Sequence, residues 1–141
     1  MAQITVEILA AVVPAARVYD VPPSLVLAVI QAESNFEPFV LGDYKDGVPH
    51  SWGLMQLHDA GGAGSFYPAG FLLDINNNVM LGTRYLAACL KAFPDDLKTG
   101  VSAYNQGITG AKKRGWEFNK PYVDKVLEAQ KKYLVFDQIL R

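Results

Sequence analysis

Hydrophobic positions repeat at helical spacing over most of the chain. The pattern predicts helices over residues 4–18, 24–36, 75–93 and 97–104. A last helix should begin at Pro121, and a short amphipathic tail over residues 134–141 should follow it. Pro14 is expected to kink the first helix or to end it early, because proline lacks a backbone N–H. No stretch has a strong strand pattern, so any sheet should be small and lie within residues 39–60. The chain is therefore predicted to be mainly α.

Length and composition fit a single globular domain. The chain has 141 residues, of which 50% are hydrophobic and 19% charged, so we assign residues 1–141 to one domain with one core. Its 13 basic and 14 acidic residues nearly cancel, which argues against nucleic acid as a partner. The single cysteine, Cys89, excludes an intrachain disulfide and is expected to be a small core residue.

The sequence gives no sign of a signal peptide, a membrane span or a metal site. Residues 1–13 lack a basic region, and Glu7 interrupts their apolar run. No apolar segment approaches the length of a membrane-spanning helix, so we expect no membrane insertion. His50 and His58 lack the helical spacing of metal ligands, so no metal site is predicted.

One acid is distinguished by its position at the end of an apolar helix. Glu33 shares a helix face with Val26, Val29 and Ile30. Burial disfavours a charged carboxylate and the negative end of the helix dipole opposes it further, so both effects raise the pKa of Glu33. A carboxylic acid that keeps its proton near neutral pH is the proton donor that cleavage of a glycosidic bond requires. On spacing alone, a Glu33 side chain that reaches solvent from the helix end is an equal alternative.

Three short motifs follow one another along the chain, the first of them beginning at this acid. They are ESNFEP at residues 33–38, GLMQL at 53–57 and AYNQG at 103–107. Their order and spacing resemble the lytic transglycosylase (SLT-type) and goose-type lysozyme superfamily, whose pattern is E-S-x-F-x-P, then G-L-M-Q, then A-Y-N-x-G. The resemblance runs from about residue 21 to 133. It implies a lysozyme-like fold and a catalytic domain that degrades peptidoglycan.

The resemblance also implies roles for particular residues. Glu33 is the expected catalytic acid, and Tyr104 is expected to hydrogen-bond it. Gly53 should let a sugar approach the backbone, and Gln56 should offer its amide, as donor and acceptor, to the sugar's acetamido group and to Glu33. No cofactor is expected, since acid–base chemistry by Glu33 suffices. The full set of expected substrate-binding residues is Ser51, Gly53, Leu54, Met55, Gln56, Ala103, Tyr104, Asn105 and Tyr122.

A polar loop over residues 39–50 departs from the pattern of most related transglycosylases, which have a shorter connection. It carries Asp43 and Asp46, and Asp59 follows the second motif. Any of the three could orient a water opposite Glu33, which would give hydrolysis, as in the goose-type muramidases. We favour the lytic transglycosylase reaction, which cleaves the bond between N-acetylmuramic acid and N-acetylglucosamine and leaves 1,6-anhydro ends. A virion domain that only binds glycan or plays a structural role is the third interpretation.

The expected partner is the glycan strand of peptidoglycan, acted on by a monomeric bacteriolytic enzyme in the periplasm or outside the cell. Three delivery routes stay open: release as a bacteriophage endolysin, transport in a phage virion, or inclusion in a longer exported protein. Lys112, Lys113 and Arg114 are expected to form a solvated face, with contact to anionic peptide stems as the alternative.

Overall fold

The computed structural model describes residues 3–59 and 62–139. Its helices are α1 (Val6–Tyr19), α2 (Pro23–Ser34), α3 (Ala69–Leu73), α4 (Ile75–Ala92), α5 (Leu97–Gln106), α6 (Ile108–Arg114) and α7 (Lys120–Ile139), with a 3-10 turn η1 (Glu117–Asn119) before the last. Its strands are β1 (Leu41–Gly42), β2 (Ser51–Trp52) and β3 (Leu57–His58). The prediction of a mainly α, lysozyme-like fold with a small sheet inside residues 39–60 is confirmed.

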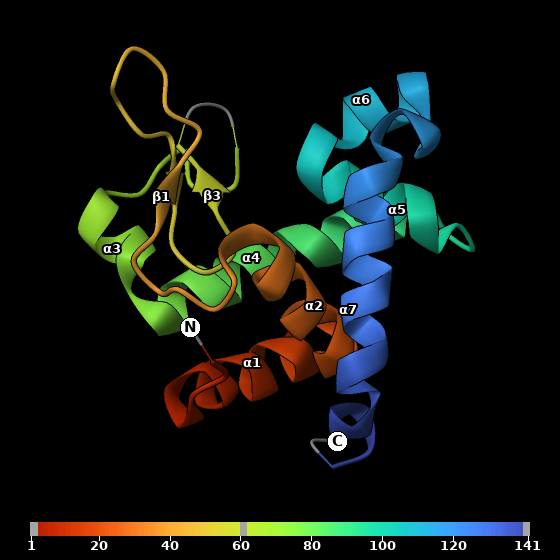
Figure 1. Ribbon diagram of the computed structural model, residues 1–141, viewed down its shortest axis with the longest axis horizontal. Helices are drawn as coiled ribbons and strands as arrows, with labels where there is room; N and C mark the ends of the chain where they lie inside the picture. The colour runs from red at the N-terminus through yellow and green to blue at the C-terminus, as the bar shows by residue number, and fades with distance from the viewer. Residues whose placement is uncertain (1–2, 60–61, 140–141) are drawn as a thin grey trace.

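The small sheet stands at one side of the molecule, and α5, α6 and α7 stand at the other (Figure 1). The three strands pair antiparallel in the order β1-β2-β3, with Leu41 opposite Trp52 and Ser51 opposite His58. In Figure 1 the sheet and α3 stand on the left, α5 and α6 stand on the right, and α4 runs between the two sides behind α2. Residues of the loop between β1 and β2 project from the sheet side, where Lys45 and Val48 form an isolated bridge.

Helix α2 is the centre of the core. Residues 25–30 are all at most 2% exposed, so α2 is surrounded by protein on every side over this stretch. A helix that is apolar all round is stable only in such a position. It packs against α7 and α1. Cys89 is also fully buried, as predicted.

Three helix ends differ from the prediction. Helix α1 continues through Pro14 to Tyr19, because Pro14 lies on the exposed face while Ala15 and Ala16 are buried on the other. Packing of that face outweighs one missing hydrogen bond. Helix α2 stops at Ser34, since Asn35 takes the left-handed conformation that ends helices, with φ 50°. The predicted tail is a continuation of α7 as far as Ile139, and residues 140–141 lie outside the described residues.

Candidate active site

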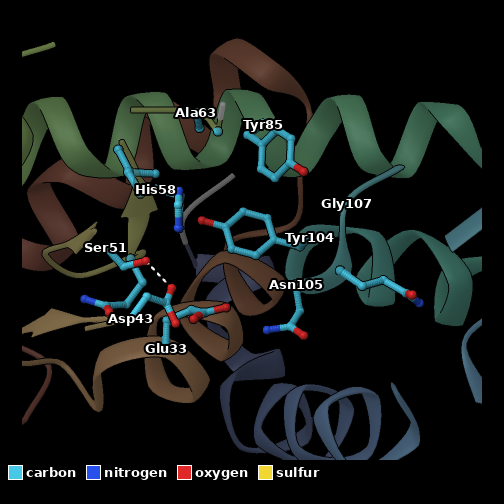
Figure 2. Close-up of a pocket in the computed structure, with 13 residues that line it drawn as sticks. Glu33, Asp43, Ser51, His58, Ala63, Tyr85, Tyr104, Asn105 and Gly107 are labelled. Atoms are coloured by element: carbon cyan, nitrogen blue, oxygen red, sulfur yellow. Dashed lines mark hydrogen bonds between the residues drawn. The ribbon is translucent and has the colours of Figure 1, made fainter. Parts of the chain in front are cut away.

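A cavity of about 280 Å³ opens between the sheet and α5 (Figure 2). Glu33 reaches it from the last turn of α2, and Asp43 and Ser51 reach it from the sheet side. The cavity brings together residues of all three motifs. Its lining comprises Glu33, Asp43, Ser51, Gln56, Leu57, His58, Gly62, Ala63, Tyr85, Tyr104, Asn105, Gln106 and Gly107.

Glu33 is half-buried and holds one strong hydrogen bond. The Tyr122 hydroxyl donates to Oε2 of Glu33 over 2.7 Å. The pKa of Glu33 is raised from 4.5 to about 7, and burial is the largest cause. The Tyr122 hydrogen bond and the charge of Lys125 lower the pKa, whereas the charge of Asp43 raises it. The predicted direction is confirmed, with burial as the main cause. An acid with this pKa is partly protonated at neutral pH and can both give and take a proton there.

The tyrosine on Glu33 is Tyr122, and the expectation that Tyr104 would hold this place is wrong. The Tyr104 hydroxyl donates instead to the backbone carbonyl of Met55 over 2.7 Å. Tyr104 is buried, its pKa is raised well above 10 mainly by burial, and its ring lies against Tyr85 with centroids 5.3 Å apart. Tyr104 therefore ties α5 to the floor of the cavity, while α7 supplies the hydroxyl that touches the acid.

The second motif builds the floor of the cavity from behind. Leu54 and Met55 are fully buried, and neither they nor Gly53 are among the residues that line the cavity. Their contact with sugar stays a prediction. Gly53 has φ 75°, and a Cβ there would lie 2.5 Å from Nδ2 of Asn78. The glycine is needed for this turn and for the approach of Asn78.

Gln56 lines the cavity but uses its amide nitrogen internally. Its Nε2 donates to the carbonyls of Val40 and Gly53, over 3.1 and 3.0 Å. Both N–H groups are thereby used, so the expected donation to an acetamido group does not fit this arrangement. Gln56 joins the segment before β1 to the turn after β2, which fixes the cavity wall opposite α5.

Asn78 holds this floor in place and carried no signal in the sequence. It lies in α4 and is 1% exposed. Its Oδ1 accepts from the Met55 N–H over 2.8 Å, and its Nδ2 donates to the carbonyls of Trp52 and Leu72 over 2.7 and 2.8 Å. Buried amides need hydrogen-bond partners of this kind. In the sequence, only the presence of a polar residue in a helix with an apolar stripe could have pointed to Asn78.

The third motif contributes Tyr104, Asn105, Gln106 and Gly107 to the lining, but not Ala103. Ala103 is fully buried, and its carbonyl accepts a long, 3.5 Å hydrogen bond from Tyr85. Asn105 is exposed in the cavity, and its Oδ1 accepts from Nδ2 of Asn119 over 2.9 Å. Because this bond uses Oδ1, the amide nitrogen of Asn105 points away from Asn119 and can donate to a ligand.

Of the three candidate second carboxylates, Asp43 alone lines the cavity with Glu33. Its Oδ2 accepts a short hydrogen bond from the Ser51 hydroxyl, drawn as a dashed line in Figure 2. Asp46 is exposed in the loop between β1 and β2 and does not line the cavity.

Asp59 is held by its neighbours outside the cavity. Trp52 Nε1 donates to its Oδ2 over 3.0 Å, and Nδ1 of His50 lies 2.8 Å from its Oδ1. These two hydrogen bonds, with Trp52 the larger cause, lower the pKa of Asp59. The His50 ring stacks on that of His58, with centroids 5.9 Å apart, and His58 lines the cavity. The sequence predicted only that His58 is not a metal ligand, and it did not indicate that His58 lies at the cavity.

The described residues contain no group of three or more acidic, histidine or cysteine side chains arranged to hold a metal ion. Within the same residues, no helix combines the length and hydrophobicity of a membrane span.

Comparison with known proteins identifies relatives over most of the chain. The family model described as "Transglycosylase SLT domain" matches residues 11–121. Membrane-bound lytic murein transglycosylase C of Salmonella arizonae is 33% identical in an alignment of 109 residues that covers 66% of this chain and 29% of that protein. The protein of the same name from Klebsiella pneumoniae is 38% identical in an alignment of 82 residues that covers 52% of this chain and 21% of the relative. The chain thus spans less than a third of the length of these relatives.

Proposed function

The chain belongs to the transglycosylase SLT domain family, and from this premise we propose that it is a peptidoglycan lytic transglycosylase. The proposed catalytic unit is a single domain over residues 1–141, and the proposed target is the bond from N-acetylmuramic acid to N-acetylglucosamine. The observation that carries the proposal is the acid itself. Glu33 stands in a cavity with its pKa raised to about 7 and its carboxylate held by Tyr122.

In the proposed reaction one carboxyl group performs both proton transfers. Glu33 gives its proton to the bridging oxygen as the bond from the anomeric carbon of muramic acid breaks. The acetamido oxygen of the same sugar supports the developing cation. The ionised Glu33 then takes the proton of the sugar's 6-hydroxyl, whose oxygen bonds to the anomeric carbon. The products are a 1,6-anhydro end and a free 4-hydroxyl, with no water consumed, and Glu33 ends the cycle protonated.

The raised pKa supports this double role. An acid with a pKa near the working pH is a good donor in one form and a good acceptor in the other. Tyr122 contributes by holding the carboxylate in one place, and Asn105 lies where its amide can meet an acetamido carbonyl. The cavity is complete within one chain, which supports the proposal of a monomeric enzyme.

Hydrolysis of the same bond is the second candidate, because Asp43 shares the cavity with Glu33. An ionised Asp43 could orient an attacking water, as a second carboxylate does in most glycosidases. Mass spectrometry of muropeptides released from purified peptidoglycan separates the two reactions. Anhydro ends are expected, and release of reducing ends alone would overturn the transglycosylase proposal. In that case Asp43→Asn should abolish their release.

A domain that binds glycan without cleaving it is separated from an enzyme by Glu33→Gln. The variant should lose wall degradation while keeping the fold, as judged by circular dichroism. Glu37→Gln is the matched control, since Glu37 is exposed four residues further on and does not line the cavity. Equal lytic activity in Glu33→Gln and the control would remove Glu33 from the mechanism.

We propose the cell wall as the site of action, in the periplasm or outside the cell. Phage lysis as an endolysin, virion transport and a longer exported protein are the three routes of delivery. A gene for a pore-forming holin or for tail proteins beside the coding gene would assign the enzyme to a bacteriophage. A coding gene that joins this domain to the rest of a longer exported protein would assign it to a bacterium.

A further inference from the structure

A positively charged segment borders the cavity on the α5 side. Residues 107–119 carry three cations, Lys112, Lys113 and Arg114, against one acid, Glu117, in a chain whose net charge is −1. The segment forms α6 and η1, and it follows directly on Gln106 and Gly107, which line the cavity. In Figure 1, α6 stands beside α5 at the upper right, across from the sheet.

Arg114 is the fixed member of this group. Its Nε donates to Oε1 of Gln106 over 3.0 Å, and its guanidinium carbon lies 4.5 Å from the centroid of the Phe118 ring. It also passes close over Gly110, where a Cβ would lie 2.4 Å from Nη2. A guanidinium normally gives up considerable side-chain entropy when it binds a ligand, and these three contacts reduce that cost.

Gln106 connects Arg114 to the cavity. Its Nε2 donates to Ser102 Oγ over 2.6 Å and to the Gly115 carbonyl over 2.9 Å, so its own position is fixed by α5 and by the end of α6. Gln106 lines the cavity, and the Arg114 guanidinium is hydrogen-bonded to Gln106. Gln106 therefore links the guanidinium to the cavity.

The outer face of the guanidinium is available to a ligand. Arg114 is exposed, and among residues 3–59 and 62–139 its two Nη atoms have no hydrogen bond or ion pair. Phe118, which supports it, is 66% exposed. A planar pair of N–H donors of this kind matches a carboxylate.

We propose that Arg114 binds a free carboxylate of the peptide stem attached to muramic acid, so that the enzyme prefers peptide-bearing glycan. The inference rests on the proposed function. The glycan backbone is uncharged where the lactyl group of muramic acid is joined to peptide, so the anions next to a bound strand are those of the stems. Lys112 and Lys113 add attraction to the same anions without the fixed geometry.

The test compares two substrates and four proteins. The substrates are glycan strands from a wall without teichoic acid, so that phosphate is absent from both. One is peptide-bearing. The other is stripped of peptides by an amidase and then amidated at the lactyl carboxyl groups that the amidase frees, so that no carboxylate remains on it. The proteins are wild type, Arg114→Gln, Arg114→Lys and Lys132→Gln. Lys132 is an exposed cation on α7 and serves as the matched charge control. The readout is the ratio of kcat/KM for peptide-bearing to stripped strands.

Arg114→Gln should lower this ratio about fivefold, near the upper end for an exposed ion pair, and leave the rate on stripped strands unchanged. Arg114→Lys should keep only part of the preference for peptide-bearing strands, because lysine lacks the planar pair of N–H donors and the Nε hydrogen bond to Gln106. Lys132→Gln should keep the whole preference. Amidation of the stem carboxyl groups should bring wild type to the level of Arg114→Gln.

An unchanged ratio in Arg114→Gln overturns the inference, and so does an equal fall on both substrates, since that would mean that Arg114 only supports Gln106 and the cavity. Both outcomes leave the proposed function intact. A wild-type protein that cleaves neither substrate would instead refute the proposed function.

Discussion

The buried acid should make the stability of the protein depend on pH in a way that Glu33→Gln removes. Glu33 has a pKa of about 7 in the folded protein, against 4.5 when solvated, mainly because it is buried. Below pH 4.5 the side chain is protonated in both the folded and the unfolded chain. Between pH 4.5 and about 7 it ionises more readily when unfolded, so the folded state loses stability as the pH rises. Above that range the loss is complete.

The size of this loss follows from the two pKa values. A rise from 4.5 to about 7 corresponds to a loss of about 3 kcal/mol, since one pKa unit is worth about 1.4 kcal/mol. This is a large part of the 5–15 kcal/mol by which folded domains are typically stable. Glutamine has nearly the shape of glutamic acid but no ionisation, so the variant escapes the loss. Its stability relative to wild type should therefore rise by about 3 kcal/mol from pH 4 to pH 9.

Urea unfolding at pH 4, 6 and 9, followed by the fluorescence of Trp52 and Trp116, measures this difference. Any constant penalty of the glutamine side chain cancels, because only the change with pH is compared. Glu37→Gln makes the same substitution at an exposed position and controls for the substitution itself. Parallel pH curves for Glu33→Gln and wild type would refute the account of a buried, proton-holding Glu33, whatever the enzyme activity proves to be.

Two further predictions test the contacts around the acid. Tyr122→Phe removes the hydrogen bond that lowers the pKa of Glu33, so the pH at which muropeptide release declines should rise by about one unit; an unchanged midpoint would contradict the role of Tyr122. Gly53→Ala places a Cβ 2.5 Å from Asn78 Nδ2 at φ 75° and should cost about 3 kcal/mol in urea unfolding. Gly47→Ala, at φ 80° with no atom within 4 Å, should cost about 1 kcal/mol, and equal costs would remove Asn78 from the explanation.

The helices were largely predictable because their apolar period is local. Asp74 caps α4 by accepting from the Asn77 N–H, as its position before an apolar stripe suggests. The errors fell where tertiary packing outweighs a local rule. Pro14 stays inside α1 because the opposite face of the helix is buried, and no local pattern reports that burial.

The candidate site was predictable only in part, for a related reason. Glu33 was found because a motif and an apolar helix face coincide on it. The choice between Tyr104 and Tyr122 could not be made from the sequence, because it depends on how α7 lies against α2, 89 residues away in the chain. Motif membership also did not separate residues that touch the cavity, such as Gln56, from those that shape it from behind, such as Met55.

The pairing of acid and tyrosine depends on the segment that the sequence suggested was a tail. Asp137, near the end of α7, accepts from the backbone N–H and the hydroxyl of Ser24, over 2.7 and 2.6 Å, at the start of α2. Tyr122, near the beginning of α7, holds Glu33 at the end of α2. The two antiparallel helices are therefore tied at both ends, and Gln130 also donates to the Ser24 hydroxyl at the Asp137 end. These contacts hold both ends of α2 against α7, the end that carries Glu33 included.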